Sequence, residues 1–316
     1  MISAFILFII CACSSTSNKI PKWVESPQDD NIESIYGVGV GLTFDTAKQS
    51  ALENIASKFS IQVESNTNNR QTLHNGRSDE LFQQNINTKV KAVQLTQYKL
   101  LKTESLNNLY YVLISISRAE FVSDKKNKLQ LLTDDIALEL KNVTSKNKVE
   151  QLYRYNKVLL LIEKAEPLIH LLRVADARFI DKVYIDKFNQ YIESERKLLA
   201  STRFFVYSTN NLYSIATSIK DSLETQGFQL APNRDADGFI DITGSIKNTT
   251  NFSTKNTRID FNVLVKSATG QVYKKSTYRT NGVSISSYKL AEEIAITKFA
   301  DKINNKLDIY KMFGFH

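Results

Sequence analysis

Three glycines at alternate positions, Gly37, Gly39 and Gly41, are the first residues whose spacing could build a ligand site. Glycine-rich turns bind phosphate in dinucleotide-binding proteins, where the motif is G-x-G-x-x-G. Here Leu42 stands where the third motif glycine should be, and no Lys-Ser or Lys-Thr pair follows to make a phosphate-binding loop. Glycines on one face of a strand also let a helix approach the backbone closely. The strip is therefore interpreted either as a packing surface or as a ligand strip.

The side chains give little support to metal binding or catalysis. The three histidines, His74, His170 and His316, are too few and too dispersed for a zinc site. Asp235 and Asp237 lie in a short loop that lacks the later glutamate of a calcium-binding loop. No Gly-x-Ser-x-Gly elbow for a nucleophilic serine occurs. We therefore expect a protein without catalytic residues, without a bound metal and without a cofactor.

The two cysteines of the chain, Cys11 and Cys13, directly follow an almost unbroken apolar run at residues 2–10. Such a run is too short for a permanent membrane span but suits the core of an export signal. The residues Ile10-Cys11-Ala12-Cys13 resemble the lipobox of bacterial lipoproteins. That resemblance implies a signal peptide at residues 1–12 and lipid attachment at Cys13. The alternative is an ordinary secretory signal with two incidental cysteines, because no Lys or Arg precedes the apolar run.

A lipid-carrying Cys13 would decide where the protein resides. Several acyl chains hold a protein firmly in a bilayer, since each buried CH₂ contributes about 0.8 kcal/mol. Residues 13–20, rich in Ser and Thr, would then form a tether. Ser14 directly after the cysteine is typical of lipoproteins directed to the outer membrane. We expect a lipid anchor in the bacterial outer membrane, with the body of the protein either periplasmic or surface-exposed.

Length and charge limit the remaining options. The 316 residues exceed the roughly 100–200 of a single domain, so two or three units are expected. The net charge of +8 comes from Lys and Arg that are interleaved with Asp and Glu in most segments. Nucleic-acid binding would favour a concentrated basic stripe with stacking aromatic residues. No nucleic-acid partner is expected, and a mildly basic surface suits anionic lipids or polymers of the cell envelope.

The glycine strip belongs to a predicted strand at residues 35–40, which leads directly into a helix that Thr43 or Asp45 can cap. Apolar residues of this helix recur at spacings of three and four: Phe44, Ala47, Ala51, Ile55 and Phe59. Further strands are expected at residues 61–65, 90–102 and 109–117. The last of these is apolar on both faces and should lie at the centre of the sheet.

Several short motifs in this region resemble a known family. They are Pro21-Lys22-Trp23-Val24, Tyr36-Gly37-Val38-Gly39, the Ala47, Ala51 and Ile55-Ala56 series, and Tyr110-Tyr111-Val112-Leu113-Ile114. Behind a lipobox, this series resembles the Lpp-twenty family of bacterial outer-membrane lipoproteins over residues 21–121. The family includes surface lipoproteins and flagellar assembly lipoproteins. The resemblance implies an α+β domain with a helix on an antiparallel sheet, in an envelope or motility-associated protein without known catalysis.

Residues 122–200 contain no glycine, and Pro167 is their one proline. Their apolar residues follow the helical spacing of three and four, with Lys and Glu between them. Because proline is tolerated in the first turn of a helix, we expect a long antiparallel hairpin of helices with a bend near Ala165. This hairpin is interpreted either as a spacer that pairs with itself or as an arm that binds a partner or self-associates.

Residues 201–316 repeat the layout of the first module. A strand at 204–208 precedes a helix that Gly227 ends, and strands follow at 239–248, 258–266 and 271–280, before a final helix. Alternating apolar and polar residues in 258–266 predict a sheet with one wet face. The predicted fold class is α+β, with two helix-on-antiparallel-sheet modules of β-α-β-β-β type separated by a long α-helical hairpin.

Two functions remain open at this point. The preferred one is a lipid-anchored envelope protein that acts as a non-enzymatic structural or assembly component, with a flagellar or other surface machine as its setting. Its partners would be the membrane, other envelope or surface-machine proteins, and in addition copies of itself as a homo-oligomer. The alternative is a periplasmic or surface module that binds peptidoglycan, another glycan or a small molecule, on the glycine strip or on the wet face of the C-terminal sheet.

Overall fold

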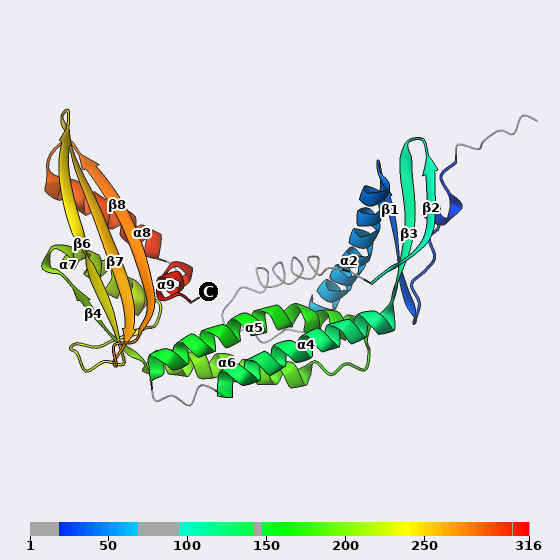
Figure 1. The fold of residues 1–316 in the computed structure, drawn as a ribbon, viewed down its shortest axis with the longest axis horizontal. Helices are drawn as coiled ribbons and strands as arrows, with labels where there is room; N and C mark the ends of the chain where they lie inside the picture. The colour runs from blue at the N-terminus through cyan, green and yellow to red at the C-terminus, as the bar shows by residue number, and fades with distance from the viewer. Residues whose placement is uncertain (1–18, 69–94, 96, 142–146, 305, 316) are drawn as a thin grey trace, which may run out of the picture. The chain divides into compact units, whose positions relative to one another are not determined.

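The computed structural model describes residues 19–68, 95, 97–141, 147–304 and 306–315, whose elements Figure 1 draws. The chain divides into two compact units. Unit 1 consists of residues 1–127 and 170–179, and unit 2 of residues 128–169 and 180–316. Each unit contains one β-sheet with helices packed on it, so the predicted α+β class with two helix-on-sheet modules is confirmed.

Unit 1 contains a three-stranded antiparallel sheet in the order β1-β3-β2. The strands span Ser34–Gly41 (β1), Lys99–Leu106 (β2) and Leu109–Ser117 (β3). β3 pairs with both neighbours and is the central strand, as its apolar residues predict. Asn107 and Asn108 turn the chain between β2 and β3 with φ angles of 52° and 62°, which asparagine tolerates better than most residues.

Helix α2 (Phe44–Asn68) packs on this sheet through the predicted stripe. Its residues Ala47, Ala51, Ile55 and Phe59 are buried against Val112, Ile114 and Ile116 of β3. The strand expected at residues 61–65 is wrong, because α2 continues through this segment. Extending an existing helix costs less than starting a new element, and no Gly or Pro stops α2 here. Of the strand expected at 90–102, residues 90–94 and 96 lie outside the described residues, and the observed strand begins only at Lys99.

The segment before β1 lies along the same sheet. It contains the short helix α1 (Lys22–Glu25), in which Trp23 donates a hydrogen bond of 2.6 Å from Nε1 to Oε1 of Glu104 on β2. Gln28 donates a hydrogen bond of 3.0 Å to the hydroxyl of Tyr36 on β1. Trp23 is the one tryptophan of the chain, so its fluorescence reports on unit 1.

Three helices follow in chain order: α4 (Arg118–Lys141), α5 (Lys148–Ala175) and α6 (Lys182–Ser201). The expected helical segment is therefore present, and its described residues form three helices instead of the two of a simple hairpin. The separate helix expected to begin near Pro167 is wrong, because α5 continues from Lys148 to Ala175 with Pro167 inside it. Proline in a helix interior removes one backbone hydrogen bond, and the burial of Ala165 and Leu168 on either side offsets that cost.

Unit 2 contains a five-stranded sheet in the order β5-β4-β6-β7-β8. The strands span Arg203–Ser208 (β4), Gln229–Leu230 (β5), Gly238–Asn251 (β6), Thr254–Ser267 (β7) and Val272–Ser284 (β8). The sheet is mixed rather than wholly antiparallel, because β4 pairs in parallel with β5 and β6. The helix between β4 and β5 returns the chain to the same end of the sheet, and such a crossover makes neighbouring strands parallel.

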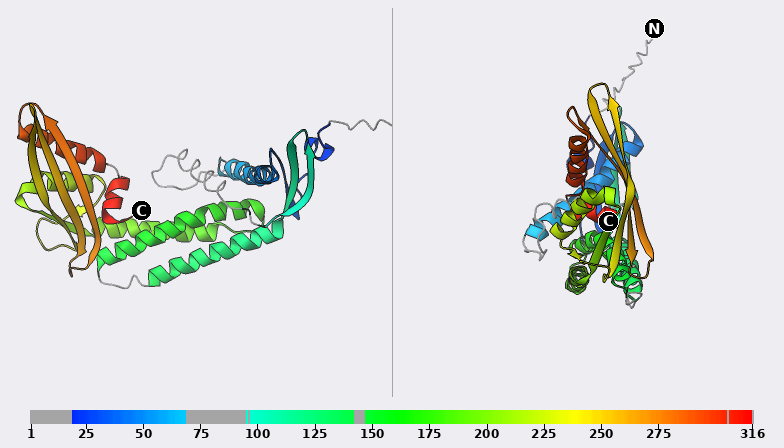
Figure 2. Two further views of the ribbon diagram at one scale, coloured as in Figure 1. Left: turned by 45° about the horizontal axis from the view of Figure 1, so that its top comes forward. Right: turned by 90° about the vertical axis from the view of Figure 1, so that its left-hand side faces the viewer.

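Two helices cover one face of this sheet, as the right-hand view of Figure 2 shows. Helix α7 (Tyr213–Thr225) follows the short 3₁₀ turn at Asn210–Leu212 and ends before Gly227, whose φ of 84° is the left-handed conformation expected of a helix terminator. Helix α8 (Tyr288–Ile303) begins after Ser287, whose hydroxyl accepts a hydrogen bond of 3.2 Å from the backbone N–H of Leu290.

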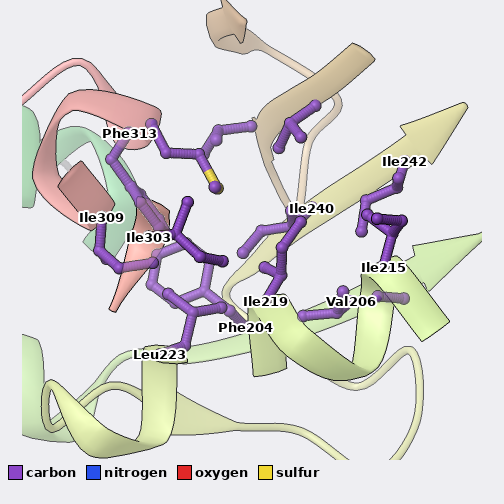
Figure 3. Close-up of a cluster of buried hydrophobic side chains, with 14 of the residues drawn as sticks. Phe204, Val206, Ile215, Ile219, Leu223, Ile240, Ile242, Ile303, Ile309 and Phe313 are labelled. Atoms are coloured by element: carbon purple, nitrogen blue, oxygen red, sulfur yellow. The ribbon is translucent and has the colours of Figure 1, made fainter. Parts of the chain in front are cut away.

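The core of unit 2 lies between the sheet and these helices. Figure 3 shows apolar side chains from β4, β6, α7 and α8 converging, together with those of α9 (Lys306–Phe313). Phe204 of β4 is fully buried and meets Phe313 of α9 edge to face, with 5.1 Å between the ring centroids. Tyr153 of α5 stacks on Tyr273 of β8 at 4.6 Å, which attaches this part of α5 to the module.

Candidate binding surface

Cys13, the predicted lipid attachment site, lies outside the described residues, together with the signal peptide expected at 1–12 and most of the expected tether. Its acylation therefore remains a prediction. In the part of the chain that the structure describes, no helix combines the length and the apolar character needed to cross a bilayer.

The backbone of α2 occupies the glycine strip. A Cβ atom added to Gly39 would lie within 3.0 Å of three backbone atoms of Ala47 and Ala51, closer than real Cβ atoms come to any neighbour. Added Cβ atoms at Gly37 and Gly41 would collide with the same helix. On this face of β1, the helix backbone fills the space that a phosphate or another ligand would need.

The start of α2 is fixed at the end of the strip by two threonines. Thr43 Oγ1 accepts a hydrogen bond of 3.2 Å from the backbone N–H of Thr46, and Thr46 Oγ1 accepts one of 3.0 Å from the N–H of Thr43. This reciprocal pair satisfies donors that a helix N-terminus leaves without partners. Of the two caps that the sequence predicts, Thr43 makes this contact.

The remaining residues considered for metal binding are dispersed or serve structural contacts. His170 is buried and lies 3.1 Å from Arg173, measured between Nδ1 and a guanidinium nitrogen. His74 and His316 lie outside the described residues. Asp237 Oδ2 accepts a hydrogen bond of 2.8 Å from the backbone N–H of Arg203. Across the described ranges, no three His, Cys, Asp or Glu side chains are grouped closely enough to hold a metal ion.

In the part of unit 2 that the structure describes, α7 and α8 lie on one face of the sheet and no helix covers the opposite face, which we call the open face. On β7 the core side carries Ile259, Phe261, Val263 and Val265, all fully buried, as the alternating pattern predicts. The open face carries the alternate residues of β7 and their neighbours on β4, β6 and β8. On β7 these residues are Arg258, Asp260, Asn262, Leu264 and Lys266.

Charged side chains on the open face are paired along its centre. Asp260 lies between Arg258, at 2.8 Å, and Arg279 on β8, at 2.5 Å. The hydrogen bond from Arg279, with the nearby charges of both arginines, lowers the pKa of the Asp260 carboxyl. At the next position of β7 on the same face, Asn262 Oδ1 accepts a hydrogen bond of 2.8 Å from the hydroxyl of Thr277. The centre of the face is a preformed array of charged and polar groups.

Aromatic side chains lie on the open face at its β4 edge. Phe205 and Phe239 meet edge to face, with 6.3 Å between ring centroids. Tyr207, two residues along β4, is 47% exposed, and the guanidinium of Arg234 lies 5.8 Å from its ring centroid. The sequence pattern does not single out these residues, because β4 is short and its pairing with β6 decides which of its side chains point away from the core.

The model of the LPP20 lipoprotein family matches residues 21–117, which confirms the resemblance predicted for residues 21–121. No curated protein matches the chain.

Solved structures also match the chain at low sequence identity. The secreted protein HP1454 from Helicobacter pylori has a TM-score of 0.49 at 16% identity, over 90% of this chain and 99% of that chain. A minor lipoprotein from Acinetobacter baumannii has a TM-score of 0.30 at 13% identity, over 35% and 92% of the two chains. The lipoprotein GNA1162 from Neisseria meningitidis has a TM-score of 0.24 at 10% identity, over 32% and 99%.

The family match covers less than half of the chain and coincides with β1, α2, β2 and β3 of unit 1. The helices that follow and the whole C-terminal module lie beyond it. Over residues 21–117 this protein thus matches the LPP20 lipoprotein family, which supports a lipid-anchored protein of the cell envelope.

Proposed function

We propose that this protein is a lipid-anchored component of the bacterial outer membrane that serves a structural or assembly role through protein–protein contacts. Cys13 would carry the lipids, and the open face of unit 2 would receive the partner. The observation that carries the proposal is the open face itself, a face of the five-stranded sheet that no described helix covers. The proposal assigns no catalytic residue.

The shape and composition of the open face favour a protein partner. Small ligands bind in concave pockets, whereas another folded protein can lie across a broad sheet surface. Arginine and aromatic residues are enriched at protein interfaces, and the open face has Arg258 and Arg279 at its centre and Tyr207 at its edge. Because Asp260 already orients both arginines, a partner with acidic groups would meet prearranged donors.

A flagellar or other surface machine is the setting that the family resemblance suggests for such a partner. Self-association through the open face is a second option. A cross-linked product with the mass of two chains would identify that option, and a product containing a second protein would identify the machine.

Site-specific photo-cross-linking in envelope fractions tests the role of the open face. A photoreactive amino acid at Asn262 or Thr277, both on the open face, should give a defined protein adduct. The matched control is Glu224, which is exposed on α7 on the opposite side of the sheet. The proposal fails when Asn262 and Glu224 give the same products, or when the open-face positions give none.

The anchor is tested separately by changing Cys13. Radiolabelled palmitate should be incorporated into the native chain and not into a Cys13→Ser variant, which should also leave the detergent-soluble envelope fraction. If the Cys13→Ser variant fractionates like the native protein, the proposed lipid anchor is wrong. The proposed role of the open face would not be affected by that result.

A glycan-binding module is the second candidate function, and the aromatic edge of the open face favours it. Tyr207, Phe205 and Phe239 present ring surfaces of the kind that can stack against sugar rings. Peptidoglycan fragments should then raise the melting temperature of the native chain but not of a Tyr207→Ala variant. Such a shift, with no protein adduct from Asn262 or Thr277, would favour this second function over the first.

A further inference from the structure

The β6–β7 hairpin of unit 2 ends in a phenylalanine that contributes nothing to the core. β6 ends at Asn251 and β7 begins at Thr254, so Phe252 and Ser253 form a two-residue loop. Phe252 is 97% exposed and has a φ of 52°. Positive φ at the first loop position favours Gly, Asn or Asp, which lack a bulky side chain. Folding alone would therefore disfavour Phe252, and such a local conflict is expected where a residue serves function.

Other exposed apolar side chains lie at the same end of the module. Val283 and Ile285, at the end of β8, are 44% and 81% exposed, and Leu290 in the first turn of α8 is 42% exposed. The pairing of Asn256 with Val283 places the end of β8 beside the hairpin. We call Phe252, Val283, Ile285 and Leu290 the apolar tip.

Contacts from α8 hold the hairpin in place. The hydroxyl oxygens of Tyr288 and Thr250 lie 2.6 Å apart, and Lys255 Nζ lies 5.4 Å from the centroid of the Tyr288 ring. Thr257 Oγ1 donates a hydrogen bond of 3.2 Å to the backbone carbonyl of Tyr288. The hairpin and the start of α8 therefore present their exposed side chains on one supported end of the unit.

The charged side chains in the segments around the apolar tip are all basic. Residues 242–259 and 280–291 contain no Asp or Glu, but they contain Lys247, Lys255, Arg258 and Lys289. On β7 the nearest carboxylate is Asp260, which is already paired with two arginines. On α8 the first acidic residues are Glu292 and Glu293, further along the helix.

We propose that the apolar tip inserts into the headgroup region of a bilayer that contains anionic phospholipid. Exposed Phe, Ile, Val and Leu side chains match the boundary between headgroups and acyl chains, and Lys side chains match anionic headgroups. Tyr288 beside the tip has the amphipathic ring that is enriched at membrane interfaces. This contact goes beyond the proposed partner binding by the open face, and it does not depend on acylation of Cys13.

Vesicle flotation of the mature chain with Cys13→Ser tests the tip without the acyl anchor. The chain should float with vesicles of phosphatidylethanolamine and phosphatidylglycerol, and much less with vesicles in which phosphatidylcholine replaces phosphatidylglycerol. Adding Phe252→Asn should weaken binding about tenfold, because one large apolar side chain no longer enters the bilayer. Adding Lys289→Gln should weaken it about fivefold and reduce its dependence on salt.

Two matched readouts separate membrane contact from folding. Val272→Asn changes a residue that is 53% exposed at the other end of β8, and it should leave flotation unchanged. Phe252→Asn should leave the melting temperature unchanged or raise it, because asparagine tolerates positive φ.

Three results would overturn the proposal. The first is equal flotation with both kinds of vesicle, and the second is undiminished flotation of the Phe252→Asn variant. The third is an absence of flotation while a photoreactive group at Phe252 captures an envelope protein, which would make the tip a protein-docking site.

Discussion

The two units build the same helix-on-strand contact with different numbers of glycines. In unit 1 the row of α2 that faces β1 is Ala47, Ala51, Ile55 and Phe59; in unit 2 the row of α8 that faces β8 is Ala291, Ala295, Phe299 and Ile303. Each row places two alanines and then two large residues at every fourth position. The small residues lie where the helix touches the strand backbone, and the large ones fill the space beyond.

The helix caps extend the parallel between the units. Thr43 in unit 1 and Ser287 in unit 2 each lie four residues before the first alanine of the row. The hydroxyl of each accepts a hydrogen bond from the backbone N–H three residues further on, those of Thr46 and Leu290. In both units, therefore, the cap sets where the first alanine meets the strand.

The strands differ. β1 presents Gly37, Gly39 and Gly41 to the helix, whereas β8 presents Gly282 and then Thr280. An added Cβ at Gly282 would collide with the backbone of Ala291 and Ala295, as at Gly39. Thr280 instead donates a hydrogen bond of 2.7 Å from Oγ1 to the carbonyl of Ala295. In unit 1 the strand backbone thus contacts the helix at all three glycines. In unit 2 it does so at Gly282, and at the next position on the same face the side chain of Thr280 makes the contact instead.

The largest effect is expected from removing the large residues of the two rows. Phe299 is buried and meets Phe261 and Tyr278 at centroid distances of 4.9 and 5.5 Å. Phe59 in unit 1 stacks on Phe121 at 4.7 Å. Truncating a buried phenylalanine to alanine costs about 3–5 kcal/mol, so both Phe299→Ala and Phe59→Ala should lower the free energy of unfolding by this amount.

Urea unfolding followed by Trp23 fluorescence separates these two variants, because Trp23 lies in unit 1. Phe59→Ala should lower the midpoint of the fluorescence transition more than Phe299→Ala does. Far-ultraviolet circular dichroism should register both changes. Equal displacement of the fluorescence transition by the two variants would contradict the assignment of the rows to separate modules.

Much of this arrangement follows from sequence periodicity. The stripes of α2 and α8 and the alternation in β7 place their apolar residues on the core side, because a buried face imposes a period of 3.6 or 2 on the sequence. Gly227 ends α7 as predicted, because few other residues adopt its positive φ without strain. These features depend on local chemistry, so a single sequence is sufficient to predict them.

Features that depend on distant parts of the chain were not predictable in the same way. The parallel pairing of β4 with β6 joins segments about thirty residues apart, and only this pairing decides that Phe205 and Tyr207 lie on the open face. Helix α2 continues through residues 61–65 because adding residues to an existing helix outweighs the preference of these residues for a strand. The exposed Phe252 follows no periodic pattern, because its position in a two-residue loop depends on the register of β6 with β7.

The second largest effect is expected at the glycines themselves. Gly39→Ala and Gly282→Ala should each destabilise the protein by about 1–3 kcal/mol, since the added methyl group meets helix backbone that cannot rotate away. Unfolding in urea gives the comparison, with Gly270→Ala as a control. Gly270 has a φ of 86° and no atom within 4 Å of an added Cβ, so that variant reports backbone strain without collision. A glycine strip that only provided flexibility would give similar costs at all three positions.

A smaller effect is expected from the side-chain contact that replaces the strip in unit 2. Thr280→Val keeps the shape of the side chain and removes the hydrogen bond to Ala295, which should cost about 1 kcal/mol. Thr277→Val is the matched control, because Thr277 is exposed on the open face and its hydroxyl can be replaced by water. The difference between the two variants in thermal unfolding measures the buried contact, and no difference would show that Thr280 acts through shape alone.

The smallest effect is expected from the pH dependence of one carboxylate in unit 1. Asp176 accepts hydrogen bonds of 2.8 Å from Lys126 Nζ and 3.0 Å from the N–H of Arg178, and these contacts lower the pKa of its carboxyl. A lowered folded-state pKa stabilises the protein above the unfolded value of about 3.9, and this contribution disappears as the pH falls through the folded pKa. Lys126 is about half exposed and Arg178 almost fully exposed, so the effect should stay below about 1 kcal/mol.

The Trp23 transition should therefore shift to lower urea as the pH falls below about 4, and part of that shift should be absent from an Asp176→Asn variant. Asp260 on the open face also has a lowered pKa, but it belongs to unit 2, so Asp260→Asn should leave the pH dependence of the Trp23 transition intact. If Asp176→Asn and the native chain show the same acid shift, other carboxylates of unit 1 determine its acid sensitivity, and the contact with Lys126 adds nothing to its stability.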